Sequence, residues 1–150
     1  MDRRAIARTG LLFGAVSGLF ALAVQLIGFY IIRDQSPWTS IAGAMLELLI
    51  IGEAGRVTGR ASGRVAAGVW TGAIAGGVSE LINHTLQDVA FTYSPAGQAA
   101  FHALNAVERA QVSDPQYIAL SLLVSVVFLI AFGALYGGLG AWSEARAKQP

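Results

Sequence analysis

Long apolar runs alternate with short polar segments along this chain. Three runs reach the roughly 20 residues that a helix needs to cross a ~30 Å hydrocarbon core, and they cover Leu11–Ile32, Val65–Ala90 and Tyr117–Trp142. A fourth run, Trp38–Gly55, is long enough but contains Glu47 and Glu53. The pattern therefore predicts four transmembrane helices, at about 10–33, 37–60, 64–90 and 115–143.

The long connection before the last run carries its own helical pattern. Ser94-Pro95 and Asp114-Pro115 are each typical of a capping residue followed by proline at the first helical position. Between them, Phe101, Leu104 and Val107 recur at three-residue spacing. This spacing predicts an amphipathic helix at about 95–111 that lies on the membrane surface. We expect an all-α fold in which residues 1–150 form a single integral membrane domain.

Composition supports a membrane protein and removes several kinds of chemistry. The chain has 150 residues, of which 55% are hydrophobic and 13% charged, whereas soluble domains carry about 25% charge. The absence of cysteine excludes disulfides, thiolate metal sites and cysteine nucleophiles. No phosphate-binding loop, hydrolase motif or metalloprotease motif is present. We therefore expect no enzymatic activity, no cofactor and no nucleic-acid partner.

The distribution of basic residues predicts the orientation. Eight of the ten lie at the two termini and in the turn between the second and third predicted helices: Arg3, Arg4, Arg8, Arg56, Arg60, Arg64, Arg146 and Lys148. Because arginine and lysine favour the cytoplasmic side, both termini are expected there, and helix 95–111 is expected outside. The expected location is a cytoplasmic membrane of the prokaryotic type.

Glycines recur four residues apart, or close to it, on every predicted transmembrane helix. Such ladders allow helix backbones to approach closely, where van der Waals contact drives association in lipid. They serve either to pack the four helices together or to face another subunit, identical or different. The helix-packing glycines are Gly10, Gly14, Gly18, Gly55, Gly59, Gly68, Gly72, Gly76, Gly133 and Gly137.

The glycine positions also indicate an internal repeat. Gly14, Ser17 and Gly18 have the same spacing as Gly68, Thr71 and Gly72. Ser36-Pro37, Gly55 and Gly59 likewise match Asp114-Pro115, Gly133 and Gly137. The sequence therefore predicts two duplicated hairpins, with the surface helix inserted in the second.

A polar layer is predicted near mid-membrane, one residue per helix: Gln25, Glu47, Glu80 and Ser125. At 1.5 Å per residue each lies roughly 10–15 Å below the outer surface. An ionisable residue at this depth is a functional-site hypothesis, because two facing carboxylates would share a proton. The alternative is a neutral glutamic acid that is hydrogen-bonded to Gln25 or Ser125 and holds the helices in register.

Asn83, His84 and Asp88 extend this layer outward along the third helix. They form either a relay to the outer surface or simply the end of the helix in the headgroup region. A divalent cation site is a weaker interpretation, because only His84 is a strong ligand type.

Two classes of function are compatible with these features. The first is a non-catalytic packing or accessory subunit, assembled with itself or with other membrane subunits in the lipid bilayer. The second is a small proton- or cation-linked transporter or channel that uses the mid-membrane carboxylates.

Overall fold

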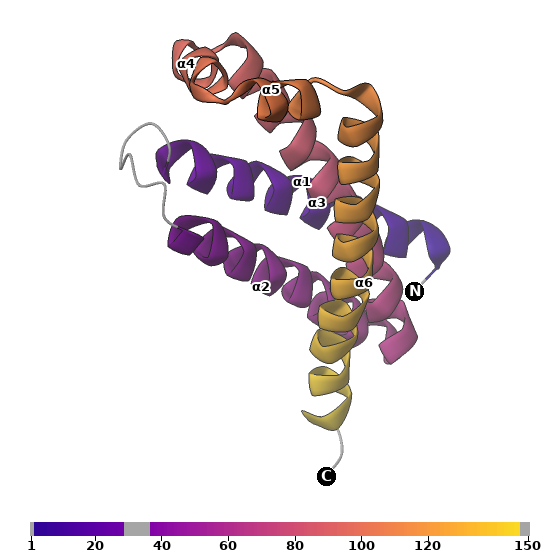
Figure 1. Ribbon diagram of the computed structural model, residues 1–150. Helices are drawn as coiled ribbons and strands as arrows, with labels where there is room; N and C mark the ends of the chain where they lie inside the picture. Colours follow the sequence, from indigo (N-terminus) through magenta and orange to yellow (C-terminus); the bar gives the residue numbers. More distant parts are fainter. Residues whose placement is uncertain (1, 29–36, 148–150) are drawn as a thin grey trace.

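The computed structural model describes residues 2–28 and 37–147, which form helices throughout (Figure 1). Residues 29–36, which include the predicted end of the first helix and Ser36 of the predicted repeat, lie outside the described residues. The helices are α1 (Arg3–Leu26), α2 (Pro37–Ser62), α3 (Val65–Tyr93), α4 (Pro95–Ala103), α5 (Ala106–Val112) and α6 (Pro115–Ala147).

Capping side chains begin several of these helices. The Asp2 side chain accepts from the backbone N–H of Ala5 at 2.7 Å, which starts α1 earlier than the apolar run alone indicates. Ser94 accepts from the N–H of Gly97 at the start of α4, and Asp114 accepts from the N–H of Gln116 at the start of α6. Gly63, with φ of 67°, ends α2 in the left-handed conformation that glycine adopts without strain.

The prediction of four transmembrane helices is wrong. Among the described residues, three helices are long and apolar enough to cross a membrane: Arg3–Ile27, Val65–Tyr93 and Pro115–Ala147. These three indicate a membrane protein. Helix α2 has the length but not the composition, because Glu47, Glu53, Arg56 and Arg60 fall within its 26 residues.

The single surface helix predicted at 95–111 is two helices, so the described chain has six. Asn105 separates them, because its side chain accepts from the N–H groups of Val107 and Glu108 and starts a new helix. The Glu108 carboxylate accepts in return from the N–H of Asn105 at 2.9 Å, which completes a capping box. An asparagine followed three residues later by glutamate is the sequence signal for this break.

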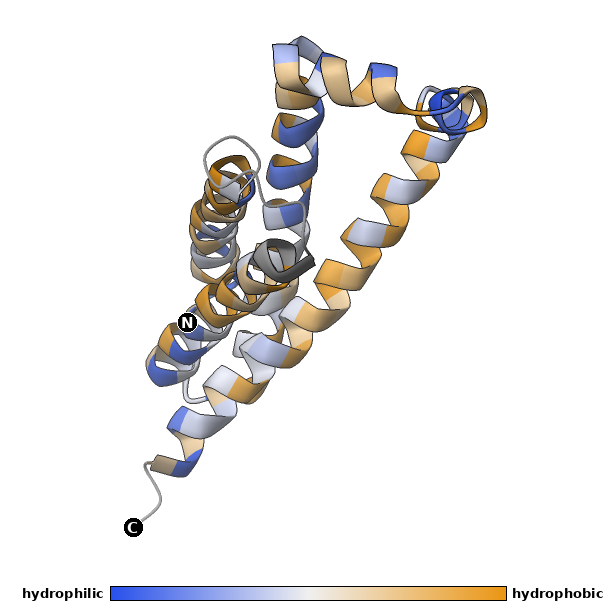
Figure 2. Ribbon diagram, turned by 60° about the vertical axis from the view of Figure 1, so that its left-hand side comes forward, coloured by the Kyte–Doolittle hydropathy of each residue, from blue (hydrophilic) through white to orange (hydrophobic). Residues whose placement is uncertain are grey.

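Helices α3 and α6 form a V that organises the molecule. They lie together at one end and separate toward the other, where α4 and α5 connect them (Figures 1 and 2). Helices α1 and α2 pack on the closed part of the V, and both termini lie away from α4 and α5 (Figure 1). Figure 2 shows that the separated half of α6 is strongly hydrophobic, whereas the separated half of α3 carries hydrophilic residues.

Glycines bring the α3 and α6 backbones into contact at the closed part of the V. A Cβ atom added to Gly72 would collide with the Gly133 carbonyl oxygen and would lie 2.8 Å from the Cα of Gly137. A Cβ at Gly68 would lie 2.6 Å from the Gly137 carbonyl oxygen, and one at Gly76 would collide with the backbone of α6. No larger residue fits this interface unless the helices move apart.

The glycines of α1 and those of α2 pack on different helices. Gly10, Gly14 and Gly18 of α1 pack on α3, where a Cβ at Gly14 would lie 2.7 Å from the Ala75 carbonyl oxygen. Gly55 and Gly59 of α2 pack on α6. In a duplicated pair of hairpins, α1 would correspond to α3 and α2 to α6. Because the α3 glycines lie against α6, the α1 glycines would then lie against α2. The matching glycines therefore have non-equivalent partners, which contradicts the predicted duplication.

We predict that Gly72→Ala lowers the free energy of unfolding by about 1–3 kcal/mol, the usual cost of overpacking. Gly52→Ala is the matched control, because its added Cβ meets only the Tyr136 carbonyl oxygen at 3.7 Å. The control is expected to be neutral or stabilised by up to about 1 kcal/mol, since alanine is the better helix former. Thermal unfolding in detergent measures both, and equal unfolding temperatures would contradict the backbone contact.

Candidate functional site

The interior is built from small and polar side chains rather than large apolar ones. Among the residues whose burial is described, the buried hydrophobic side chains other than Ile51 are all alanines. The buried polar residues come from three helices and include Ser17, Glu47, Thr58, Thr71, Ser79 and Asn83. This composition follows from the glycine contacts, because helices that approach so closely leave no room between them for leucine or phenylalanine.

Glu47 lies at the centre of this polar interior, where α1, α2 and α3 meet. Its residue is 6% exposed, and its Oε1 accepts a hydrogen bond from the hydroxyl of Ser79 at 2.5 Å. The hydroxyl of Ser17 donates to the backbone carbonyl of Glu47 at 3.3 Å. Within the described part of the chain, no arginine or lysine forms an ion pair with Glu47. One hydroxyl therefore bonds the carboxyl group and another bonds the backbone of the same residue, and no described arginine or lysine pairs with the acid.

The inner side of this environment is closed. Ile51, Ala54 and Ala75 are all 0% exposed and separate Glu47 from a second polar contact nearer the α2–α3 turn. In that contact, Thr58 donates to the carbonyl of Ala54, and Thr71 lies 3.1 Å from Thr58. These threonines satisfy their hydroxyls within their own two helices.

Glu80 faces a different neighbour from Ser79, although the two are adjacent in α3. Its side chain interacts with Ser125 of α6 and, electrostatically, with His84. His84 in turn lies 3.5 Å from Asp88, from Nε2 to Oδ2. The structure thus brings Glu80, His84 and Asp88 into one sequence of contacts that runs toward α4.

The predicted polar layer is divided between two faces of α3. Glu47 lies on the Ser79 side and Glu80 on the Ser125 side, yet the two carboxyl groups are near enough to repel each other. Gln25 does not join either pair: its Oε1 is buried and has no hydrogen-bond partner among the described residues. The same holds for Oδ1 of Asn83, one turn outward from Ser79.

Sequence reasoning missed Ser17 and Ser79, the two hydroxyls that hold Glu47. Their signal was the register of small residues: Ser17 lies between Gly14 and Gly18, and Ser79 follows Gly76 by three. Both therefore share the glycine-bearing faces that pack most closely. His, Asp and Glu do not gather in groups of three that would hold a metal ion in the described ranges.

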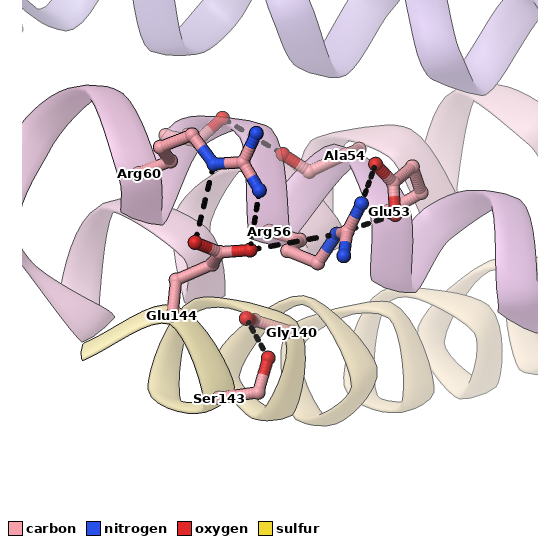
Figure 3. A network of polar contacts seen from close by, with 8 residues as sticks. Glu53, Ala54, Arg56, Arg60, Gly140, Ser143 and Glu144 are labelled. Atoms are coloured by element: carbon pink, nitrogen blue, oxygen red, sulfur yellow. Dashed lines mark hydrogen bonds and ion pairs between the residues drawn. The ribbon is translucent and has the colours of Figure 1, made fainter. Parts of the chain in front are cut away.

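A cluster of charges ties α2 to α6 at the end near the carboxyl terminus (Figure 3). Arg60 binds both carboxylate oxygens of Glu144, at 3.1 and 2.9 Å, and this hydrogen bonding raises the pKa of the Arg60 guanidinium. Arg56 pairs with Glu53 at 2.8 Å and lies 3.7 Å from Glu144. The cluster is exposed on the arginine side, so it orients the two helices and adds little stability.

A cavity of about 500 Å³ lies between the end of α3 and helices α4 and α5. Its walls include the apolar residues Phe91, Phe101, Leu104 and Val112. No carboxyl group lines it. The cavity is therefore separate from the buried acid.

Comparison of the chain with known protein families, curated proteins and solved structures finds no match. The interpretation of the site rests on its own geometry and chemistry.

We predict that Ser79→Ala lowers the free energy of unfolding by about 1–3 kcal/mol, because it leaves the buried Glu47 carboxyl without its donor. The double variant Glu47→Met with Ser79→Ala removes both partners and is expected to recover most of that loss. Chemical or thermal unfolding of the two variants measures the difference. A double variant no more stable than Ser79→Ala would show that the contact does not carry this energy.

Proposed function

We propose that the protein lies in a cytoplasmic membrane of the prokaryotic type with both termini on the cytoplasmic side. The concentration of arginine and lysine at the termini and at Arg56, Arg60 and Arg64 supports this orientation. With three apolar membrane-crossing helices, both termini share one side only because α2 carries the chain back between them, packed against α1, α3 and α6. Helices α1 and α3 run the same way, α2 and α6 run the opposite way, and α4 and α5 lie at the end remote from the termini (Figure 1).

Our proposed function is proton-linked transport, as a small transporter or channel without enzymatic activity. The observation that carries it is Glu47, a carboxyl group with 6% exposure whose side chain bonds to the Ser79 hydroxyl. Burying a carboxylate without a cation costs free energy that the neutral acid avoids. Gain and loss of a proton is therefore the chemistry that this environment controls, and a residue with a purely structural task would not need to be ionisable.

Among the described residues, a route for the proton leads along α3 toward the outer side. Glu80 interacts electrostatically with both Glu47 and His84, and His84 lies 3.5 Å from Asp88 near the end of α3. Inward, Ile51, Ala54 and Ala75 close the path. Such an arrangement corresponds to one state of an alternating-access cycle, in which the site is connected to one side at a time.

Proton flux into liposomes that contain the purified protein tests this function. We predict that Glu47→Gln and Glu80→Gln each reduce the flux to nearly that of empty liposomes, because an amide does not exchange a proton with its neighbours. Glu53→Gln is the control, since Glu53 belongs to the exposed charge cluster at the opposite end. Flux that survives in both Glu47→Gln and Glu80→Gln would refute the proposal.

A second candidate is a non-catalytic accessory subunit, and the surface of α6 favours it. Leu120, Leu123, Val124, Val127 and Phe128 are each 55–60% exposed on the half of α6 that has separated from α3. This face would pack against a second copy or another membrane subunit. The glycine ladders support the assembly less directly, because they are engaged in contacts within the chain.

The mass of the gently solubilised particle tests the second candidate. We predict that Leu123→Trp reduces a larger particle to a single chain, because the added ring would block the α6 face. Leu49→Trp is the control, since Leu49 is 65% exposed on α2 and lies outside this face. A single chain in the wild type, or equal masses for both variants, would rule out an interface on α6.

A further inference from the structure

An apolar groove of about 360 Å³ runs along the surface where α3 and α6 lie together. Ala134 and Gly138 line it one helical turn apart on α6, and their lack of bulky side chains leaves the hollow. Its remaining walls are larger apolar side chains of both helices: Val65, Val69, Leu135, Leu139 and Trp142. The groove therefore follows from the same small-residue composition that lets α3 and α6 approach each other.

The groove has about the length of one membrane leaflet. From Ala134 it extends to Trp142, eight residues further along α6, which is about 12 Å at 1.5 Å per residue. Half of a ~30 Å hydrocarbon core is about 15 Å. Both helices are apolar enough to cross a membrane, and Leu135 and Leu139 are half-exposed. The groove therefore faces the bilayer.

A hydrocarbon chain fits this groove better than a protein helix does. A helix with its side chains is about 10–12 Å across, so a 12 Å length of it occupies roughly 1,000 Å³. The groove offers about 360 Å³, which lies within the range of about 300–1,000 Å³ that is usual for small-molecule sites. An acyl chain of the surrounding lipid therefore matches both its size and its apolar walls.

Arginine lies at the end of the groove that is nearer the termini. The Arg146 guanidinium lies 4.0 Å from the centre of the Trp142 ring, which lines the groove. A cation over an aromatic face is attracted by the ring, so Trp142 holds this charge beside the groove. Arg64 directly precedes Val65, which lines the groove at the start of α3. Both helices thus bring an arginine to the same end.

No carboxylate matches these two positive charges. Within the described chain, the arginine–carboxylate pairs join Glu53 and Glu144 to arginines of α2, and none of them includes Arg64 or Arg146. Basic pockets between transmembrane helices bind anionic lipid headgroups. The groove therefore combines apolar walls for an acyl chain with unmatched positive charge at the level of the headgroup.

We propose that the groove binds one anionic phospholipid of the leaflet on the side of the termini. One acyl chain lies over Ala134 and Gly138, and the phosphate group binds the Arg146 guanidinium, with Arg64 adding charge at the same end. Arginine suits this role because its planar fork donates two parallel hydrogen bonds to a phosphate. No residue of this site takes part in the proposed proton route, so lipid binding is independent of transport.

Thermal unfolding of the delipidated full-length protein in a neutral detergent tests the headgroup contact. Saturating phosphatidylglycerol is expected to raise the unfolding temperature of the wild type by about 5 °C more than phosphatidylcholine with the same acyl chains does. Arg146→Gln removes the phosphate partner and should lose most of this difference. Arg3→Gln is the matched control and should keep it, because it removes an exposed arginine of α1 that does not line the groove.

A second variant tests the apolar part of the site. Gly138→Leu places a side chain in the groove and should also remove most of the difference between the two lipids. Its Cβ would lie 3.0 Å from Cγ2 of Val69, the end of a side chain that can move. Ala134→Leu fills the same groove from one turn away and takes its place if Gly138→Leu does not fold.

Several results would overturn the proposal. They are equal unfolding temperatures in the two lipids, an equal loss in Arg146→Gln and Arg3→Gln, and an unchanged response when the groove is filled. Inorganic phosphate at the same concentration is expected to have no effect, and a shift equal to that of phosphatidylglycerol would assign the site to a free anion. A delipidated wild type that forms a dimer and does not respond to lipid would assign the groove to a second copy. None of these measurements uses proton flux, so their failure is distinct from failure of the proposed function.

Discussion

The close approach of the α3 and α6 backbones at Gly72, Gly133 and Gly137 is the constraint on which the other contacts depend. In lipid, apolar side chains gain nothing by leaving one hydrocarbon environment for another, so helix association relies on close van der Waals contact. Gly55 of α2 also packs on Gly137, so a third helix meets α3 and α6 at the same point. Helix α1 then packs its own glycines on the face of α3 that remains.

Close packing also determines which side chains are buried. Thr58 and Thr71 are small, and each hydroxyl donates to the backbone carbonyl four residues earlier in its own helix. Their burial therefore costs little free energy. Glu47 is different, because it is long, ionisable and dependent on a neighbouring helix for its donor. A structure that needed only tight contacts would have had serine or alanine there, which is why Glu47 carries the functional argument.

The sequence predicted the helical class and several helix starts because these depend on local chemistry. A capping residue followed by proline favours a helix start through local chemistry alone. The structure begins α4 and α6 directly after Ser94 and Asp114. The number of membrane-crossing helices was overestimated, because apolar length was given more weight than the charges of α2. The capping box at Asn105 was overlooked inside an amphipathic pattern that continues across it.

The arrangement of the site depends on how each helix is rotated about its own axis. The depth of a residue in the membrane does not determine that rotation. Glu47 and Glu80 were expected at one level, but only the structure shows that α3 directs Ser79 and Glu80 to different neighbours. The pairing of Glu144 with Arg60 was likewise not predicted, because the two residues are distant in the sequence. The duplication failed for the same reason, since equal spacing of glycines does not determine which helix they face.

The triangle formed by α3, α6 and the α4–α5 connection has a mechanical consequence. Its vertex is the contact of Gly76 with α6, and its far side lies about 25 Å along α3 from that vertex. A rotation of about 5° at the vertex would move Tyr93 by roughly 2 Å at this rise per residue. The break at Leu104 and Asn105 provides a joint that can absorb such a displacement. In this geometry, a small rearrangement of the glycine backbones would produce a larger displacement further along α3, toward His84 and Asp88.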